Sequence, residues 1–456
     1  MLFKEDFAWG VATASYQIEG AYTEDGRGLS VWDVFSHEKG KTYSGHTGDI
    51  ACDHYHRFKE DIKIMSELGI KAYRFSLSWS RIFPEGTGKV NEKGVKFYSD
   101  LIDELLKYGI EPYITLFHWD YPYELYKKGG WLNNDSVGWF ADYAQKVVEL
   151  FSDRVKNFIT FNEPQCFIGH GFEQGVHAPG LKLPYKDIFQ MCHNVLKAHG
   201  AAVVAMRQNA KQKIKIGYAP TGAANYPASD DAADIEAARK SFFECPPIVN
   251  DNMIMGSVSW WSDPVVLGCY PEEGLKMYKE YLPDITDADM KLISQPIDFY
   301  CQNIYNGKEV KADEFGSPII VDRCLGHGKT AAQWPVTPKC MHWAPKFLYE
   351  RYNLPIFISE NGMSAHDVVS LDGKVHDPNR IDFVNRYLLE LEKAIADGVD
   401  VQGYFLWSFM DNFEWALGYS ERFGIVYVDY NTQERIVKDS GYWYKNWIES
   451  NTNGKN

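Results

Sequence analysis

The sequence of 456 residues lacks an excess of positive charge. It holds 47 Lys and Arg against 62 Asp and Glu, which gives a formal net charge of −15. A protein that binds nucleic acid or an anionic membrane surface needs a basic patch to neutralise phosphates, and no basic stripe occurs in this chain. We therefore expect neither nucleic acid nor a membrane as a partner.

Long apolar runs, paired cysteines and metal-ligand spacings are also missing. No uninterrupted apolar stretch reaches the ~20 residues of a membrane-spanning helix, and Met1 to Phe7 shows no signal-peptide pattern. The eight Cys form no CxxC pair, which favours free thiols in a reducing compartment. His54 and His56 do not share a helix face, so surface or capping roles are favoured over a metal site. These absences predict a cytoplasmic protein without a metal.

Eight short apolar segments alternate with segments of helical periodicity. The predicted strands are Ala8–Ala12, Ala72–Leu77, Pro112–Phe117, Asn157–Phe161, Ile214–Ala219, Asp298–Ile304, Pro355–Ser359 and Gly403–Ser408. Between them, apolar residues recur three and four positions apart, which indicates helices, as in Phe58, Ile62, Met65 and Leu68.

This alternation predicts an α/β fold, a single-domain (β/α)8 TIM barrel over residues 1–456 with a core from about 7 to 447. Long loops are expected around 220–260 and 306–345. The alternative is an open doubly wound sheet, but no glycine-rich phosphate loop follows an early strand.

Two of the predicted strands lead into glutamates: Glu163 in Thr160–Pro164 and Glu360 in Ile358–Gly362. Because the carboxyl ends of barrel strands meet at one face, both side chains are expected in one pocket. A glycosidase of the two-carboxylate type needs such a pair, one as proton donor and one as anion. The alternative for Glu163, which precedes Pro164, is that it only caps the next helix.

The other predicted strand ends carry polar and aromatic residues. They are Gln17, Arg74, His118, Trp119, Asn162, Asn303, Tyr305, Trp407, Glu414 and Trp415. Such a set is poor for a core and suited to a ring of hydroxyl groups. Aromatic residues make up 15% of the chain, and although most are expected in the core, their placement here favours sugar binding.

On these motifs the sequence resembles the family 1 glycoside hydrolases, which include β-glucosidases and β-galactosidases. The similar segments are Phe7–Gly20, Tyr73–Ser76, Phe117–Trp119, Thr160–Pro164, Asn303–Tyr305 and Ile358–Gly362. The resemblance runs from about Phe7 to Trp447. It implies a retaining β-glycosidase without a cofactor, with Glu360 as nucleophile, Glu163 as acid/base, and a small β-glycoside as substrate.

The resemblance also implies roles for the neighbouring residues. Arg74 and Tyr305 would keep the nucleophile ionised and oriented, and Asn162 would hold the sugar 2-hydroxyl. The 3-, 4- and 6-hydroxyls would be bound by Gln17, His118, Glu414 and Trp415. Trp407 would be the stacking platform, with Trp119 and Asn303 in the same binding set.

Substrate choice is indicated in part. Trp334 resembles the family's aglycone-stacking Trp, although it would serve equally to pack its loop. Glu414 and Glu421 would repel a phosphate dianion, which predicts an unphosphorylated sugar. Glucosyl residues are expected first, with galactosyl and fucosyl residues as further substrates. The alternatives are a catalytically silent sugar-binding barrel and an enzyme that mainly transglycosylates; a homo-oligomer is compatible with the sequence.

Overall fold

Eight parallel strands close into a barrel in the computed structural model, which describes residues 2–249 and 253–452. They are β1 (Ala8–Ala12), β2 (Ala72–Ser76), β3 (Glu111–Phe117), β4 (Asn157–Asn162), β5 (Lys215–Ala219), β7 (Phe299–Asn303), β10 (Ile356–Asn361) and β11 (Val401–Trp407). The last strand pairs back with the first, from Ala8 opposite Gly403 to Ala12 opposite Trp407. All eight predicted strands are confirmed, and so is the (β/α)8 barrel.

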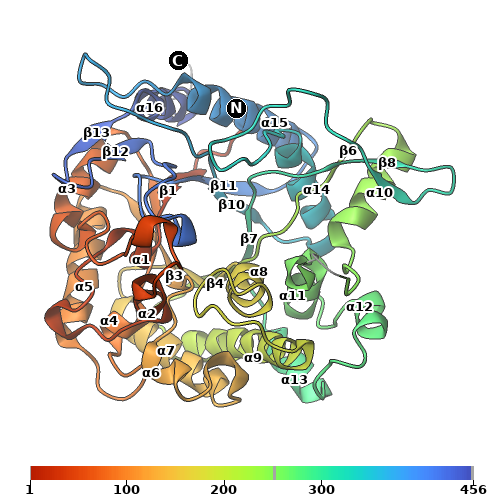
Figure 1. The fold of residues 1–456 in the computed structure, drawn as a ribbon, viewed down its shortest axis with the longest axis horizontal. Coiled ribbons are helices and arrows are strands. Elements are labelled where there is room, and N and C mark those ends of the chain that lie inside the picture. The colour runs from red at the N-terminus through yellow and green to blue at the C-terminus, as the bar shows by residue number, and fades with distance from the viewer. Residues whose placement is uncertain (1, 250–252, 453–456) are drawn as a thin grey trace.

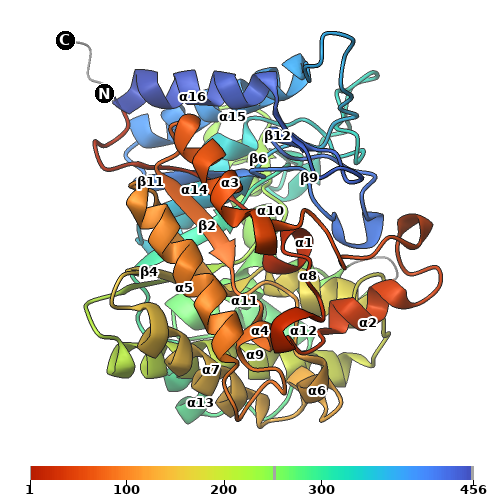
Figure 2. The same cartoon turned by 90° about the vertical axis from the view of Figure 1, so that its left-hand side faces the viewer.

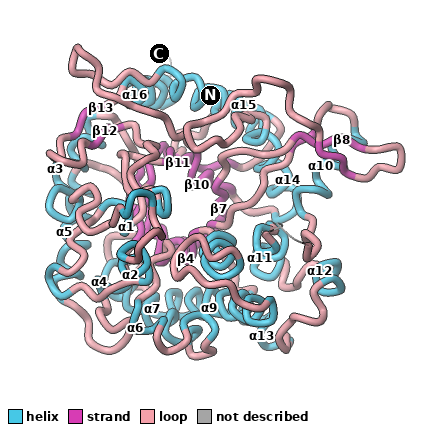
Figure 3. The backbone as a smooth tube through the Cα atoms, in the orientation of Figure 1, coloured by secondary structure: helices cyan, strands magenta, loops and turns pink. Residues whose placement is uncertain are grey.

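Helices surround the strands on the outside, as Figure 3 shows in cyan around magenta. Strands β1, β2, β4, β7 and β10 are buried along their whole length. Helices cover one face of each parallel strand, and side chains inside the barrel cover the other. A strand buried on both faces appears in the sequence as a continuous apolar run. That is why the barrel strands are visible in the sequence.

The longer helices follow barrel strands along the chain and lie around the barrel (Figure 1). They are α3 (His54–Glu67), α5 (Glu92–Lys107), α7 (Ser136–Phe151), α9 (Tyr185–Asn209), α14 (Cys340–Tyr352), α15 (Pro378–Ala396) and α16 (Asp439–Thr452). Figure 2 looks onto α3 and α5, with β2 next to them. Gly69, Gly109 and Gly398 follow α3, α5 and α15 with φ of 69°, 68° and 93°, the left-handed conformation in which glycine ends a helix.

Shorter elements fill the loops that follow the strands. These are α1 (Ser15–Ile18), α2 (Val31–His37), α4 (Trp79–Ile82), α6 (Tyr123–Tyr126), α8 (Pro164–Ile168), α10 (Ala232–Phe243), α11 (Val258–Val266), α12 (Glu272–Met277) and α13 (Asp287–Ile293). Two small sheets join them, one of β6 (Tyr226–Pro227), β8 (Glu309–Ala312) and β9 (Pro318–Ile320), the other of β12 (Val426–Val428) and β13 (Arg435–Val437). The regions expected as long loops therefore contain regular structure, and residues 250–252 of the first lie outside the described residues.

Three further expectations can be compared with the structure. All eight cysteines are free thiols, and only Cys269 and Cys324 are exposed. His54 is buried and its Nδ1 lies 2.7 Å from Asp61 Oδ2, so the expected surface or capping role was wrong for this residue. Within residues 2–249 and 253–452, no helix is long and apolar enough to cross a membrane.

Candidate active site

The carboxyl ends of the barrel strands open onto a cavity of about 520 Å³. Nine of the residues predicted from the sequence line it: His118, Trp119, Glu163, Tyr305, Trp334, Glu360, Trp407, Glu414 and Trp415. The other four, Gln17, Arg74, Asn162 and Asn303, are buried and hydrogen-bonded to this first group. The structure thus brings the whole predicted set together in two layers.

Glu360 lies near the end of β10 and accepts two hydrogen bonds. Arg74 Nη1 donates to its Oε1 at 2.7 Å, and the Tyr305 hydroxyl donates to its Oε2 at 2.7 Å. Burial raises the pKa of Glu360 to about 7; the Arg74 guanidinium opposes this shift and the charge of Glu163 adds to it. The two donors orient the carboxyl, but burial outweighs them, so Glu360 is harder to ionise than an ordinary glutamate.

Glu163 stands at the junction of β4 and α8 with a left-handed backbone (φ 45°, ψ 67°). Its side chain makes no capping bond to α8, whose first residue is Pro164. Instead it accepts a hydrogen bond from Asn303 Nδ2 at 2.7 Å. A strained conformation at a cavity is typical of functional residues, and the helix-cap alternative does not account for this geometry.

Asn162 is the centre of the layer behind the carboxyls. Its Oδ1 accepts from Arg74 Nη2 at 2.5 Å and from Asn303 Nδ2 at 3.0 Å. Its Nδ2 lies 3.0 Å from His118 Nε2. Burial lowers the pKa of His118 well below its usual range, so the ring is neutral and Nε2 accepts this bond. The proton then resides on Nδ1, which is buried, has no hydrogen-bond partner among the described residues, and is free to donate to a hydroxyl.

Gln17 and Glu414 form a second polar group at the cavity. Gln17 lies in α1, a short helix, and its Nε2 donates to Phe413 O at 2.9 Å and to Glu414 Oε2 at 3.4 Å. Its Oε1 is buried without a hydrogen-bond partner in the described chain. Burial raises the pKa of Glu414 to about 8, and the charges of Glu360 and Glu421 add to the shift. The free acceptor Oε1 of Gln17 and the carboxyl of Glu414, which has few donors, can both form hydrogen bonds with hydroxyl groups of a ligand.

Aromatic rings form much of the cavity wall. The His118 ring is stacked at 5.8 Å on both Trp407 and Trp415, with interplanar angles of 26° and 24°. Trp334 meets Tyr305 edge-on at 5.2 Å and Phe423 at 5.7 Å. All of these rings line the cavity, and Trp334 therefore does more than pack its own loop.

Sequence reasoning missed several lining residues. They are Cys166, His170, His177, Thr221, Gly222, Ala223, Met253, Asn306, Leu417 and Phe423. Most lie in loops without a periodic pattern, so nothing in the sequence marked them. Cys166 lies three residues after Glu163; burial raises the pKa of its thiol well above the usual range, which disfavours thiolate chemistry.

The family model described as Glycosyl hydrolase family 1 matches residues 1–453. The chain is 49% identical over 454 residues to Beta-glucosidase A of Thermotoga maritima and 47% identical over 455 residues to Beta-glucosidase A of Acetivibrio thermocellus, covering 98% of both chains in each case. A solved family 1 b-glucosidase from Thermotoga maritima in complex with isofagomine lactam superposes with a TM-score of 0.89, at 48% identity and with 98% and 99% of the two chains covered. The chain therefore belongs to glycosyl hydrolase family 1.

Proposed function

We propose that this chain is a retaining β-glucosidase that removes terminal non-reducing β-D-glucosyl residues from disaccharides, short oligosaccharides or aryl glycosides. The observation that carries the proposal is the unlike environment of two buried carboxyls at one cavity. Glu360 accepts a guanidinium and a phenol hydrogen bond, whereas Glu163 accepts one from an amide. Double displacement needs one carboxylate as nucleophile and one carboxylic acid as proton donor. The β-glucosidase names of the relatives support the choice of sugar.

In the first step, a Glu360 oxygen bonds to the anomeric carbon while the bond to the leaving oxygen breaks. Glu163 gives its proton to that oxygen. The Arg74 guanidinium and the Tyr305 hydroxyl donate to Glu360 and stabilise its anion. We therefore assign nucleophilic attack to Glu360 and proton donation to Glu163.

In the second step, Glu163 takes a proton from water as the water oxygen attacks the anomeric carbon and the ester bond to Glu360 breaks. Esterification has removed the negative charge of Glu360, so ionised Glu163 no longer faces a second anion. The sugar leaves with its original anomeric configuration. This course requires the two carboxyls to lie about 5–5.5 Å apart.

The remaining residues bind the sugar in this proposal. Asn162 contacts the 2-hydroxyl, and its partner His118 donates through Nδ1 to another hydroxyl. Gln17 and Glu414 hold the hydroxyls at the far side of the ring, where the free Gln17 oxygen accepts. Trp407 stacks on the sugar face, with Trp119, Asn303 and Trp415 completing the pocket and Trp334 contacting the leaving group. Galactosyl and fucosyl residues are further substrates, since Gln17 and Glu414 can bind either C4 epimer.

Azide rescue tests the two carboxyl roles. Glu360→Ala should abolish turnover of an activated aryl β-glucoside, and azide should restore it with formation of the α-glucosyl azide. Glu163→Ala should give the β-glucosyl azide. Glu414→Ala, which removes a third carboxyl at the same cavity, is the matched control and should not be rescued. A β-azide from Glu360→Ala would remove the nucleophile role.

Two alternatives have distinct outcomes. A sugar-binding barrel without catalysis would leave p-nitrophenyl β-glucoside intact, and an enzyme that mainly transglycosylates would yield oligosaccharides at high sugar concentration. Both Glu163 and Glu360 line the cavity, which favours a catalytic barrel over the sugar-binding one; product analysis separates hydrolysis from transglycosylation. The eight free thiols support a cytoplasmic location, and the homo-oligomer stays a prediction that the mass in solution tests.

A further inference from the structure

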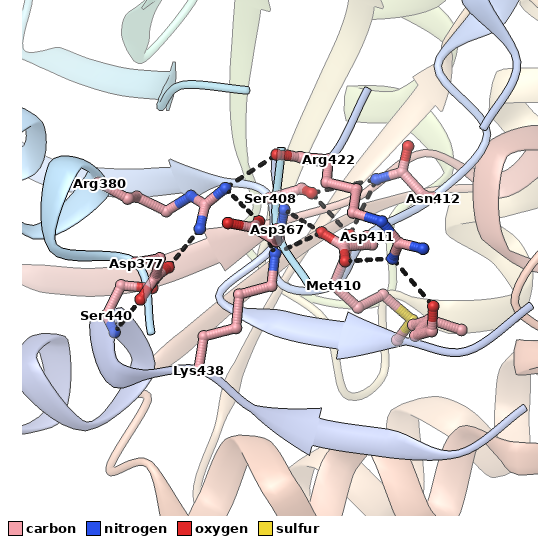
Figure 4. A network of polar contacts seen from close by, with 12 residues as sticks. Asp367, Asp377, Arg380, Ser408, Met410, Asp411, Asn412, Arg422, Lys438 and Ser440 are labelled. Carbon is pink, nitrogen blue, oxygen red and sulfur yellow. Dashed lines mark hydrogen bonds and ion pairs between the residues drawn. The ribbon is translucent and has the colours of Figure 1, made fainter. Parts of the chain in front are cut away.

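Six charged side chains form a cluster next to the segment that carries Glu414 (Figure 4). They are Asp367, Asp377, Arg380, Asp411, Arg422 and Lys438. They come from the loops after β10 and β11, from the start of α15 and from the residue between β13 and α16. None of these described residues lines the cavity, so the proposed chemistry does not use them directly.

Lys438 lies at the centre of this charge cluster. Its side chain is 0% exposed, and Nζ donates to Asp411 Oδ1 at 2.7 Å and to Asp367. Arg422 Nη1 donates to the other oxygen of Asp411 at 2.7 Å. Arg380 pairs with Asp367 and Asp377, so three positive and three negative charges balance. Buried ions are tolerated only when they are paired and hydrogen-bonded, which fixes the relative positions of these segments.

One connection leads from Asp411 to the sugar-facing residues. The Asp411 backbone N–H donates to Val426 O at 2.9 Å, and Gly424 N–H donates to the Asp411 carboxylate at 3.0 Å. The next residue is Asn412, whose Nδ2 donates to Ser408 Oγ at 3.0 Å and whose Oδ1 accepts from Gln17 Nε2 at 3.1 Å.

The orientation of the Gln17 amide therefore depends on a segment that the charge cluster holds. With its Nε2 directed to Asn412 and Phe413, the Gln17 Oε1 is left as the free acceptor. Glu414 lies two residues beyond Asn412 on the same segment. A displacement of this segment would move both hydroxyl-binding groups.

A second connection leads to the other part of the cavity wall. The Arg422 backbone oxygen accepts from Arg380 Nη2 at 2.9 Å and from the Ala365 N–H at 3.0 Å. The next residue, Phe423, lines the cavity and packs on Trp334. The charge cluster thus holds the backbone on both sides of the pocket.

We propose that Lys438 and Asp411 are positioning residues for substrate recognition, which hold the segment from Asp411 to Trp415 where Gln17 and Glu414 meet the outer hydroxyls of the sugar. This inference rests on the proposed function. Loss of the pair should weaken recognition of the hydroxymethyl side of the ring while leaving Glu163 and Glu360 in place.

The test compares an aryl β-glucoside with the aryl β-xyloside, which lacks the hydroxymethyl group. The charge-balanced variant Lys438→Met/Asp367→Asn removes one charge of each sign and leaves Asp411 with Arg422. We expect kcat/KM to fall about tenfold or more on the glucoside and less than about threefold on the xyloside, so that the glucoside preference is reduced. Should this variant not fold, Lys438→Gln is measured in its place.

The control is Asp263→Asn/Arg351→Met, which removes another ion pair (Arg351 Nε to Asp263 Oδ1, 2.8 Å) with a buried aspartate and a partly exposed arginine, outside the cavity. The control should leave the glucoside-to-xyloside ratio unchanged. An unchanged ratio in the folded Lys438 variant, or the same change in the control, overturns the positioning role. Failure of the unmodified enzyme to cleave the glucoside refutes the proposed function instead, so the two failures can be told apart.

Discussion

Replacement of Arg74 by Met should move the acid limb of the pH–rate profile toward alkaline pH. Arg74 Nη1 lies 2.7 Å from Glu360 Oε1, and the two charge centres are therefore roughly 4 Å apart. At the effective dielectric constant of about 20 that suits protein sites, such a pair interacts by about 4 kcal/mol. One pH unit of pKa corresponds to about 1.4 kcal/mol, so loss of the guanidinium, partly offset by water, should raise the pKa of Glu360 by about two pH units.

The assay is kcat/KM for an aryl β-glucoside between pH 5 and 10. Glu360 reacts as the anion, so an acid limb near pH 7 should move to roughly pH 9, with about a fiftyfold loss of kcat/KM at pH 7 that shrinks as the pH rises. Arg74→Lys, which keeps the charge but not the fork of donors, is the control and should shift the limb less. A loss that is uniform across pH in a folded variant would refute the electrostatic argument and leave Arg74 a packing role.

Three further outcomes follow from the site. In the unmodified enzyme, kcat/KM should decrease as the pH is lowered through about 7, because burial raises the pKa of Glu360. An acid limb with the pKa of an ordinary glutamate would contradict this. Glu414→Gln should be more stable than the unmodified protein at alkaline pH. A carboxyl whose pKa is raised from 4.5 to about 8 loses stability as pH rises through that window, so the gain should be absent at pH 4.5 and reach on the order of 2–5 kcal/mol above pH 8 in chemical unfolding. Trp334→Ala should raise KM for cellobiose about tenfold and leave methyl β-glucoside nearly unchanged, and equal effects on both would show that Trp334 does not contact the leaving group.

Much of the fold and the inner site could be predicted because the signals are local. A strand buried on both faces must be apolar throughout, so β4 and β10 read as runs that end in Glu163 and Glu360. Gly69 and Gly109 mark helix ends because their backbone is left-handed. Closure of the barrel then places all strand ends at one face, which is why residues as far apart as Arg74 and Glu360 were expected together.

The outer pocket could not be predicted in the same way. His177 and Phe423 line the cavity from loops, and His170 lines it from a short π-helical turn, Gly169–Glu173. Side chains in such segments are placed by their packing rather than by a periodic pattern. The regions around 220–260 and 306–345 were expected as loops, yet they form α10, the start of α11 and the small sheet of β6, β8 and β9. Strand β8 there alternates polar and apolar residues, and β9 has only three residues, two of them exposed, so neither shows the longer buried apolar run that marks a barrel strand.

The sequence by itself determined the barrel and the positions of the two glutamates and the polar and aromatic residues at the strand ends. Burial requires an apolar run in each barrel strand, and the strand ends where that apolar run ends. Only the tertiary structure decided how the two carboxyls differ. Asn303 donates to Glu163, while Arg74 and Tyr305 converge on Glu360 from β2 and from the loop after β7. It also decided that Lys438, which reads as an ordinary surface lysine, is fully buried between Asp367 and Asp411. Hydrogen bonds and burial depend on which distant segments meet, and that information exists only once the chain has folded.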